Sequence, residues 1–110
     1  MKNESTVIQQ ITDKAIKKGK KALYLVLKKK SFSQKVIEKL EKEIEIRMQK
    51  FLEEIYPKLI ELKFEKPKES IKYIILKGLI NILKKMINEH SIELSKEDAN
   101  ALDDIMKDDE

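Results

Sequence analysis

The sequence predicts an all-α protein, a small bundle of three main helices followed by a short C-terminal helix. Among its 110 residues are only two glycines and two prolines, so residues that interrupt helices are rare. Apolar residues recur at intervals of three and four along most of the chain, which is the period of an amphipathic helix. With 41% hydrophobic residues, a chain of this length buries one modest core. We therefore expect a single helical domain over residues 1–110.

The first helix is expected over residues 6–30. Thr6 and Gln9 have the spacing of a capping box, in which the hydroxyl and the amide each satisfy a backbone N–H group. Gly19 admits two interpretations: it could end a first short helix, or it could let a neighbouring helix approach closely. The apolar stripe comprises Ile8, Ile11, Ala15, Gly19, Ala22 and Val26.

The second helix is expected to begin after Ser33. This serine has the N-cap character that favours a helix start, and Phe32 and Ile37 flank it with the spacing of a hydrophobic staple. Ser31 with Gln34 offers an alternative capping box. In either case the chain turns between the first two helices.

The second helix, expected over residues 34–63, contains Pro57. Proline removes a backbone donor and crowds the preceding turn, so we expect a kink or a brief break near Tyr56. The apolar phase continues unchanged beyond the proline, which indicates that both halves face one core. The stripe comprises Ile37, Leu40, Ile44, Met48, Phe51, Ile55, Leu59 and Leu62.

The third helix is expected over residues 69–90 and is apolar around more than half of its circumference. Such a helix must be surrounded by other helices or by a second subunit. We expect core or interface positions at Ile74, Leu79, Ile82 and Met86, and another at Leu25 of the first helix.

A short fourth helix is expected over residues 96–107, because Ser95 and Asp98 have capping-box spacing. Its acidic end is expected to fray.

Composition excludes several classes of protein. The chain has no cysteine, so it forms neither a disulfide nor a thiolate metal site. No apolar run reaches the roughly 20 residues of a membrane span, and the first ten residues lack the apolar stretch of a signal peptide. We expect a cytoplasmic protein. Enrichment in Lys and Glu is typical of thermophilic organisms and suggests an archaeal source.

The sequence gives little support for an enzyme. His90 is the only histidine, and its place near the end of the third helix favours a structural role beside the negative helix terminus. Glu53 and Glu54 are adjacent on a helix, so their side chains diverge by about 100° and do not form an acid–base pair. Residues 103–110 are acidic but lack the ligand spacing of a calcium loop. We expect no catalysis, cofactor, metal ion or small-molecule substrate.

Charge is separated along the chain. Residues 1–35 carry ten lysines and two acidic residues, a net charge of +8, whereas residues 91–110 carry two basic and eight acidic residues, a net charge of −6. On the first helix, an arc of about 120° holds the candidate nucleic-acid-binding residues. They are Lys14, Lys17, Lys18, Lys21, Lys28 and Lys29.

This lysine arc has few acidic neighbours, unlike the Lys–Glu pairs elsewhere in the chain. The simplest interpretation of this arc is a solvent-exposed face with no ligand. Clustered lysines repel one another, however, unless a phosphate polyanion lies nearby or the acidic C-terminal segment folds back on them. Lysine suits contact with the phosphate backbone, and the absence of arginine from this face of the helix argues against base reading. We predict a non-catalytic accessory protein of a nucleic-acid machine or nucleoprotein.

Two further functions stay open. A protein adaptor, or a small subunit docked on a larger enzyme such as a DNA polymerase, would use apolar helix faces for hetero- or homo-oligomerisation. Exposure of Leu25 or Tyr24 within the lysine arc would favour this adaptor, because an apolar anchor in a charged rim suits a protein interface. A basic amphipathic helix can also lie on anionic lipid, but the apolar stripe lacks the Trp and Phe that favour membrane binding.

Residues 57–106 resemble the histone fold: a short helix, the loop "FEKPKES", a longer central helix, the loop "SIEL" and a capped short helix. The resemblance covers less than half of the chain and lacks an arginine in the first loop. It implies dimerisation through the third helix and contact with DNA.

Overall fold

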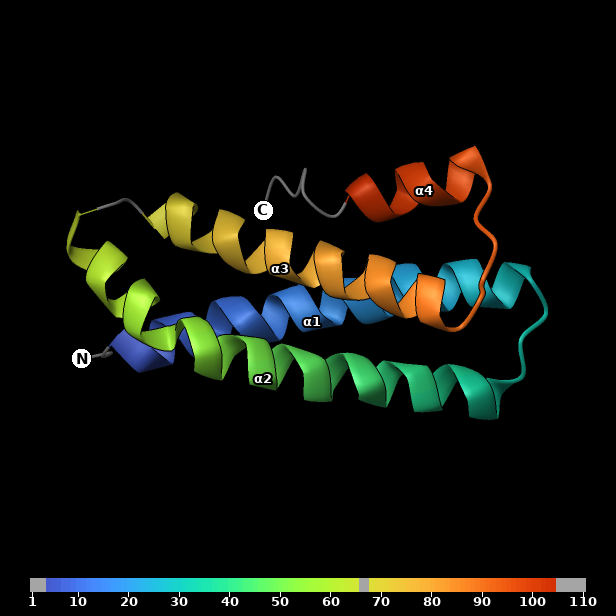
Figure 1. Cartoon of the computed structure of the whole chain (residues 1–110), viewed down its shortest axis with the longest axis horizontal. Coiled ribbons are helices and arrows are strands. Elements are labelled where there is room, and N and C mark those ends of the chain that lie inside the picture. The colour runs from blue at the N-terminus through green and yellow to red at the C-terminus, as the bar shows by residue number, and fades with distance from the viewer. Residues whose placement is uncertain (1–3, 66–67, 105–110) are drawn as a thin grey trace.

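The computed structural model describes the backbone of residues 4–65 and 68–104 and the side chains of residues 7–59 and 71–104. These residues form a bundle of three long helices with a short helix packed against it, which confirms the predicted fold class (Figure 1). None of the described helices is both long and apolar enough to cross a membrane. The helices are α1 (Glu4–Lys29), α2 (Gln34–Glu65), α3 (Lys68–Glu89) and α4 (Lys96–Asp103).

Helix α1 is continuous through Gly19, so the alternative of two short helices is wrong. A Cβ atom at Gly19 would lie 2.8 Å from Cδ1 of the buried Leu79 side chain. Glycine therefore allows α1 and α3 to approach closely. The helix already includes Glu4, so the predicted capping box at Thr6 is also wrong.

The turn between α1 and α2 uses two adjacent serines for different purposes. Ser31 adopts φ 66°, and the Phe32 N–H group donates to the Leu27 carbonyl at 3.0 Å, as in a Schellman motif. Ser33 Oγ then accepts from the Val36 N–H group at 3.3 Å. Ser33 is thus the N-cap of α2, as predicted, and Ser31 closes α1 instead of opening α2.

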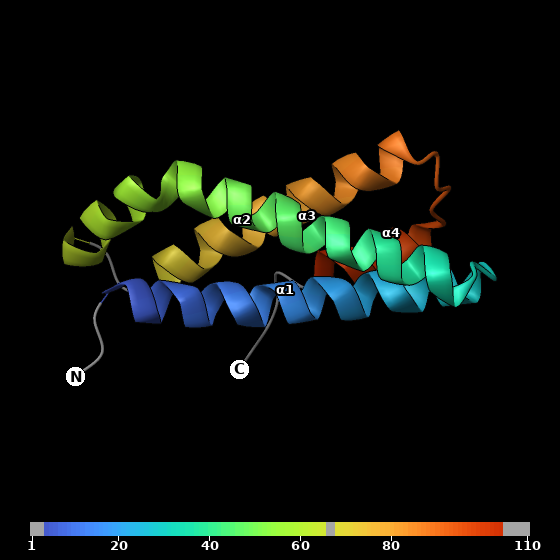
Figure 2. The same cartoon turned by 90° about the horizontal axis from the view of Figure 1, so that it is seen from below.

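Helix α2 continues through Pro57 without a break. Its last part bends away from the axis of the first part, as the yellow-green segment in Figures 1 and 2 shows. Leu52 before the proline and Leu59 after it are both buried, so the two parts face one core, as the apolar phase predicted. A separate short helix beginning at residue 57, which the histone resemblance implies, is not present.

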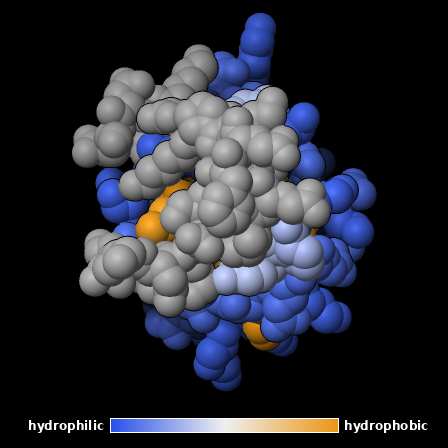
Figure 3. Space-filling view, turned by 90° about the vertical axis from the view of Figure 1, so that its left-hand side faces the viewer, coloured by the Kyte–Doolittle hydropathy of each residue, from blue (hydrophilic) through white to orange (hydrophobic). Residues whose placement is uncertain are grey.

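The core runs along the whole bundle between the three long helices. Leu79 and Met86 are buried there, as predicted, whereas Ile74 and Ile82 are only partly buried at its edge. At the end of the bundle where α1 begins, the described surface is mostly hydrophilic, with small apolar patches (Figure 3). The largest fully buried side chains are Ile8, Leu23, Leu27, Ile37, Ile44, Met48, Leu59, Ile71, Ile75, Leu79, Leu83 and Met86.

Helix α4 begins with the predicted capping box. Ser95 Oγ accepts from the Asp98 N–H group at 3.0 Å, and the Asp98 carboxylate accepts from the Ser95 N–H group at 3.3 Å. Leu102 is buried and fixes α4 to the bundle. The helix ends at Asp103, and residues 105–107, predicted to continue it, lie outside the described part of the chain.

Candidate functional site

Four lysines follow one exposed side of α1. Lys14, Lys17, Lys21 and Lys28 are all exposed, and we call them the lysine strip. Their spacing of three, four and seven residues keeps them on one side of the helix, over a length of about 21 Å at 1.5 Å per residue. The rigidity of a single continuous helix therefore fixes the order and spacing of four positive charges.

The lysine strip has no acidic partner in the described part of the chain. No described carboxylate oxygen lies within 4.0 Å of its Nζ atoms. The nearest aromatic ring is that of Tyr24, whose centroid lies 6.0 Å from Lys28 Nζ. By contrast, Lys20 on the neighbouring side of α1 pairs with Glu45 of α2. The bundle thus neutralises the lysine that faces α2 and leaves the strip facing solvent.

Two of the six lysines predicted to bind nucleic acid lie beside acidic residues near α4 and not on the lysine strip. Lys29 Nζ lies 2.9 Å from a Glu97 oxygen and 3.5 Å from an Asp98 oxygen. Its hydrogen bond to Glu97 raises the pKa of the Lys29 ammonium. Lys18 is half-buried and lines a groove between α1 and α4 together with Asp104. The acidic segment therefore folds back on part of the lysine arc, which is one of the two arrangements expected from the sequence.

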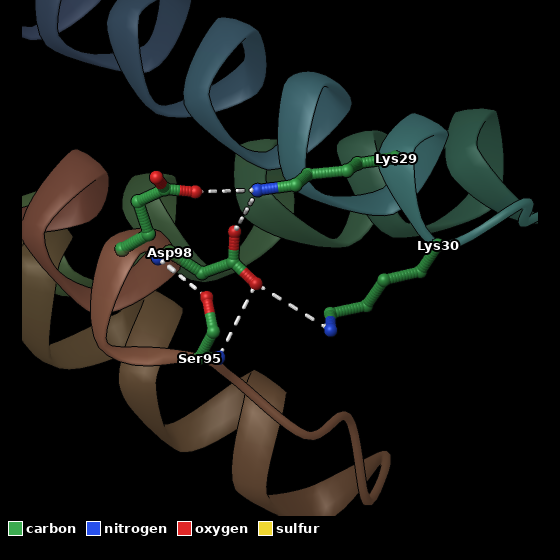
Figure 4. A network of polar contacts seen from close by, with 5 residues as sticks. Lys29, Lys30, Ser95 and Asp98 are labelled. Atoms are coloured by element: carbon green, nitrogen blue, oxygen red, sulfur yellow. Dashed lines mark hydrogen bonds and ion pairs between the residues drawn. The ribbon is translucent and has the colours of Figure 1, made fainter.

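Asp98 joins α4 to the end of α1 (Figure 4). Its side chain is only 6% exposed, and its second oxygen lies 3.4 Å from Lys30 Nζ. The hydrogen bond from the Ser95 backbone N–H group is the main reason that the pKa of Asp98 is lowered, and Lys29 and Lys30 lower it further. Sequence reasoning missed Lys30 and this role of Asp98. The capping-box spacing indicated the intrahelical bonds but gave no signal for the contact with α1.

Leu25, expected at an interface or in the core, is 58% exposed and lies between Lys21 and Lys28 on α1, so it is not part of the core. It lines the shallow groove of about 350 Å³ between α1 and α4, beside Ala22 and Ala101. Such an exposed apolar side chain among lysines is the feature expected of a protein interface.

His90 has a structural place between α3 and α2. Its Nε2 atom lies 3.2 Å from a Glu43 carboxylate oxygen. Arg47 pairs with Glu43 and with Glu89, so the four residues connect the end of α3 to α2. In the described part of the chain, no group of three or more His, Cys, Asp or Glu side chains could hold a metal ion.

Comparisons with protein families, curated proteins and solved structures gave no significant match. Function is therefore inferred from the surface of the described residues.

Proposed function

We propose that the protein is a non-catalytic helical accessory protein that binds the phosphate backbone of nucleic acid without sequence specificity. The observation that carries the proposal is the lysine strip, which presents four ammonium groups on one side of α1 with no described carboxylate within 4.0 Å. Lysine is a flexible point charge that contacts phosphates without reading bases.

Repulsion among its lysines favours binding of the lysine strip to a polyanion. Lys17 and Lys21 are four residues apart, so their like charges destabilise the free helix slightly. A phosphate backbone relieves this repulsion and releases its own condensed counterions when lysines replace them. A continuous row of phosphates suits a row of lysines better than a single small anion does. The strip therefore favours a polymeric ligand.

The test compares two variants with the same change in net charge. The strip variant replaces Lys14, Lys17, Lys21 and Lys28 by Gln. The control variant replaces four exposed lysines of α2 by Gln: Lys35, Lys39, Lys42 and Lys50. Fluorescence anisotropy would measure binding to a labelled mixed-sequence duplex of about 30 base pairs and to one of its single strands, at about 50 mM salt.

We expect the strip variant to bind at least about tenfold more weakly than wild type, and the control variant to lose less than about threefold. Circular dichroism would check that both variants keep the helical content of wild type. Equal losses in the two variants would mean that overall charge, and not the strip, attracts nucleic acid. Absence of wild-type binding at low salt would contradict the proposal.

A protein adaptor is the second candidate function, and the exposure of Leu25 favours it. An apolar side chain surrounded by lysines suits an anchor on an acidic partner such as a larger enzyme. This function predicts association that persists in high salt and that Leu25→Ala weakens, because apolar burial is not screened by ions. The measurement is recovery of one partner at about 0.5 M salt with wild type but not with Leu25→Ala.

A further inference from the structure

Helix α4 is an acidic helix that lies on lysines of its own chain. Glu97 contacts Lys29 at 2.9 Å, and Asp103 lies 3.6 Å from Lys84 of α3. Figures 1 and 2 show α4 beside one end of the bundle, near the last turns of α1 and α3. The helix thus places carboxylates on basic groups of two other helices.

The lysines that pair with α4 continue the lysine strip. Lys29 follows Lys28 directly, and Lys30 comes next, 3.4 Å from an Asp98 oxygen. Together with Lys84, they form what we call the paired patch. The Lys29 and Lys84 side chains are 58% and 59% exposed, so α4 neutralises their charges without burying them.

The contacts that hold α4 are few and partly open to solvent. Leu102 is its single buried apolar residue. In the pair of Lys29 with Glu97 the side chains are 58% and 84% exposed, so salt screens their attraction and the pair contributes little to stability. A helix of eight residues is not stable in isolation. Helix α4 is therefore held by few contacts: the buried Leu102, the buried Asp98 carboxylate beside Lys29 and Lys30, and exposed ion pairs.

We propose that α4 masks a second phosphate-binding patch, formed by Lys29, Lys30 and Lys84, and that a nucleic-acid backbone bound to the lysine strip displaces it. This inference rests on the proposed function. Phosphates on the strip would lie next to the carboxylates of α4, and repulsion between them weakens the docking of the helix. The freed lysines then contact further phosphates. By linkage, the factor by which bound nucleic acid weakens the docking of α4 equals the factor by which docked α4 weakens nucleic-acid binding.

The first arm of the test removes two exposed carboxylates of α4 and keeps its N-cap. Glu97→Gln with Asp103→Asn is compared with Glu53→Gln and Glu54→Gln, an exposed pair on α2 with the same change in charge. We expect the α4 variant to bind the duplex about three- to tenfold more tightly than the control variant. Adding Lys29→Gln and Lys84→Gln to the α4 variant should remove this gain.

The second arm follows α4 directly by hydrogen–deuterium exchange. The amides of residues 96–103 in wild type should exchange faster when saturating duplex is bound, while those of the three long helices keep their protection. Unchanged or slower exchange there would overturn the displacement of α4, as would equal affinities of the α4 variant and its control. If wild type binds through the strip, only the masking inference then fails. If wild type does not bind the duplex at all, the proposed function fails as well.

Discussion

Gly78 lies where α3 packs against the ring of Phe51 on α2. A Cβ atom at Gly78 would lie 2.3 Å from two carbons of that ring, which is an overlap that the rigid ring can relieve only by moving as a whole. Overpacking of this kind lowers the free energy of unfolding by about 1–3 kcal/mol. The better helix propensity of alanine offsets about 1 kcal/mol of this loss. We predict that Gly78→Ala lowers the free energy of unfolding by up to about 2 kcal/mol, measured by urea denaturation.

The smaller side chain in Phe51→Leu supplies a control for this prediction. In the double variant, Gly78→Ala should cost less than it does alone, because the overlapping ring is gone. A Gly78→Ala variant at least as stable as wild type would show that α2 and α3 do not approach as closely as described.

Two serines close helices in a conformation that suits glycine better. Ser31 and Ser91 have φ values of 66° and 55°, each at the end of a Schellman motif. The left-handed region costs a residue with a Cβ atom roughly 1–2 kcal/mol, against about 0.5–1 kcal/mol for the greater chain entropy of glycine. We predict that Ser31→Gly and Ser91→Gly each stabilise the fold by up to about 1 kcal/mol.

Urea midpoints of the two variants check this second prediction. Ser33→Gly is a contrasting variant, because Ser33 caps α2 through its hydroxyl and has no such strain. It should not stabilise the protein. Loss of stability in both Ser31→Gly and Ser91→Gly would contradict the assignment of these turns.

At the scale of elements, the docking of α4 should depend on pH. The pKa of Asp98 is lowered in the folded state, chiefly by its hydrogen bond from the Ser95 N–H group. A lowered folded pKa means that the stabilisation is present above the unfolded value of about 3.9 and is lost as pH falls through the folded value. We predict that α4 loosens below about pH 4, whereas α1, α2 and α3 lose less protection at that pH.

Methyl NMR signals of the buried Leu102 would report this release. Asp98→Asn should weaken the docking at neutral pH and remove its dependence on acid, because the amide has no proton to gain. A wild-type Leu102 signal that stays unchanged from pH 7 to about pH 3 would contradict the role given to Asp98.

Most of the extent of each long helix could be predicted from the sequence, because the capping residues and the periodicity of the apolar residues agreed. The phase of α2 continued past Pro57 to the buried Leu59, and the caps at Ser33 and Ser95 set two helix starts. The capping pattern at Thr6 failed because serine, threonine and glutamine also occur inside helices, where no orphan N–H group needs them. For Gly19, only the position of Leu79 on another helix decides between a break and a close contact.

At the scale of the whole molecule, the basic residues of α1 and the acidic residues of α4 are brought together. The sequence could locate the lysine arc on one side of α1, because helical periodicity fixes directions within one helix. It could not determine which helix covers which part of that arc. Only the packing of α4 shows that Lys29 pairs with Glu97, whereas Lys21 and Leu25 line the groove between α1 and α4.

Salt dependence of nucleic-acid binding tests the central claim most directly. Association constants for a mixed-sequence duplex would be measured from about 30 to 300 mM salt for wild type and for the strip variant. Four lysine–phosphate contacts predict a slope of about −3 to −4 in a log–log plot for wild type, steeper by up to about 3 if displacement of α4 frees three further lysines. The strip variant should lose most of this slope. The same slope in both proteins, or no wild-type binding at the lowest salt, would contradict the assignment of the lysine strip as a phosphate-binding surface.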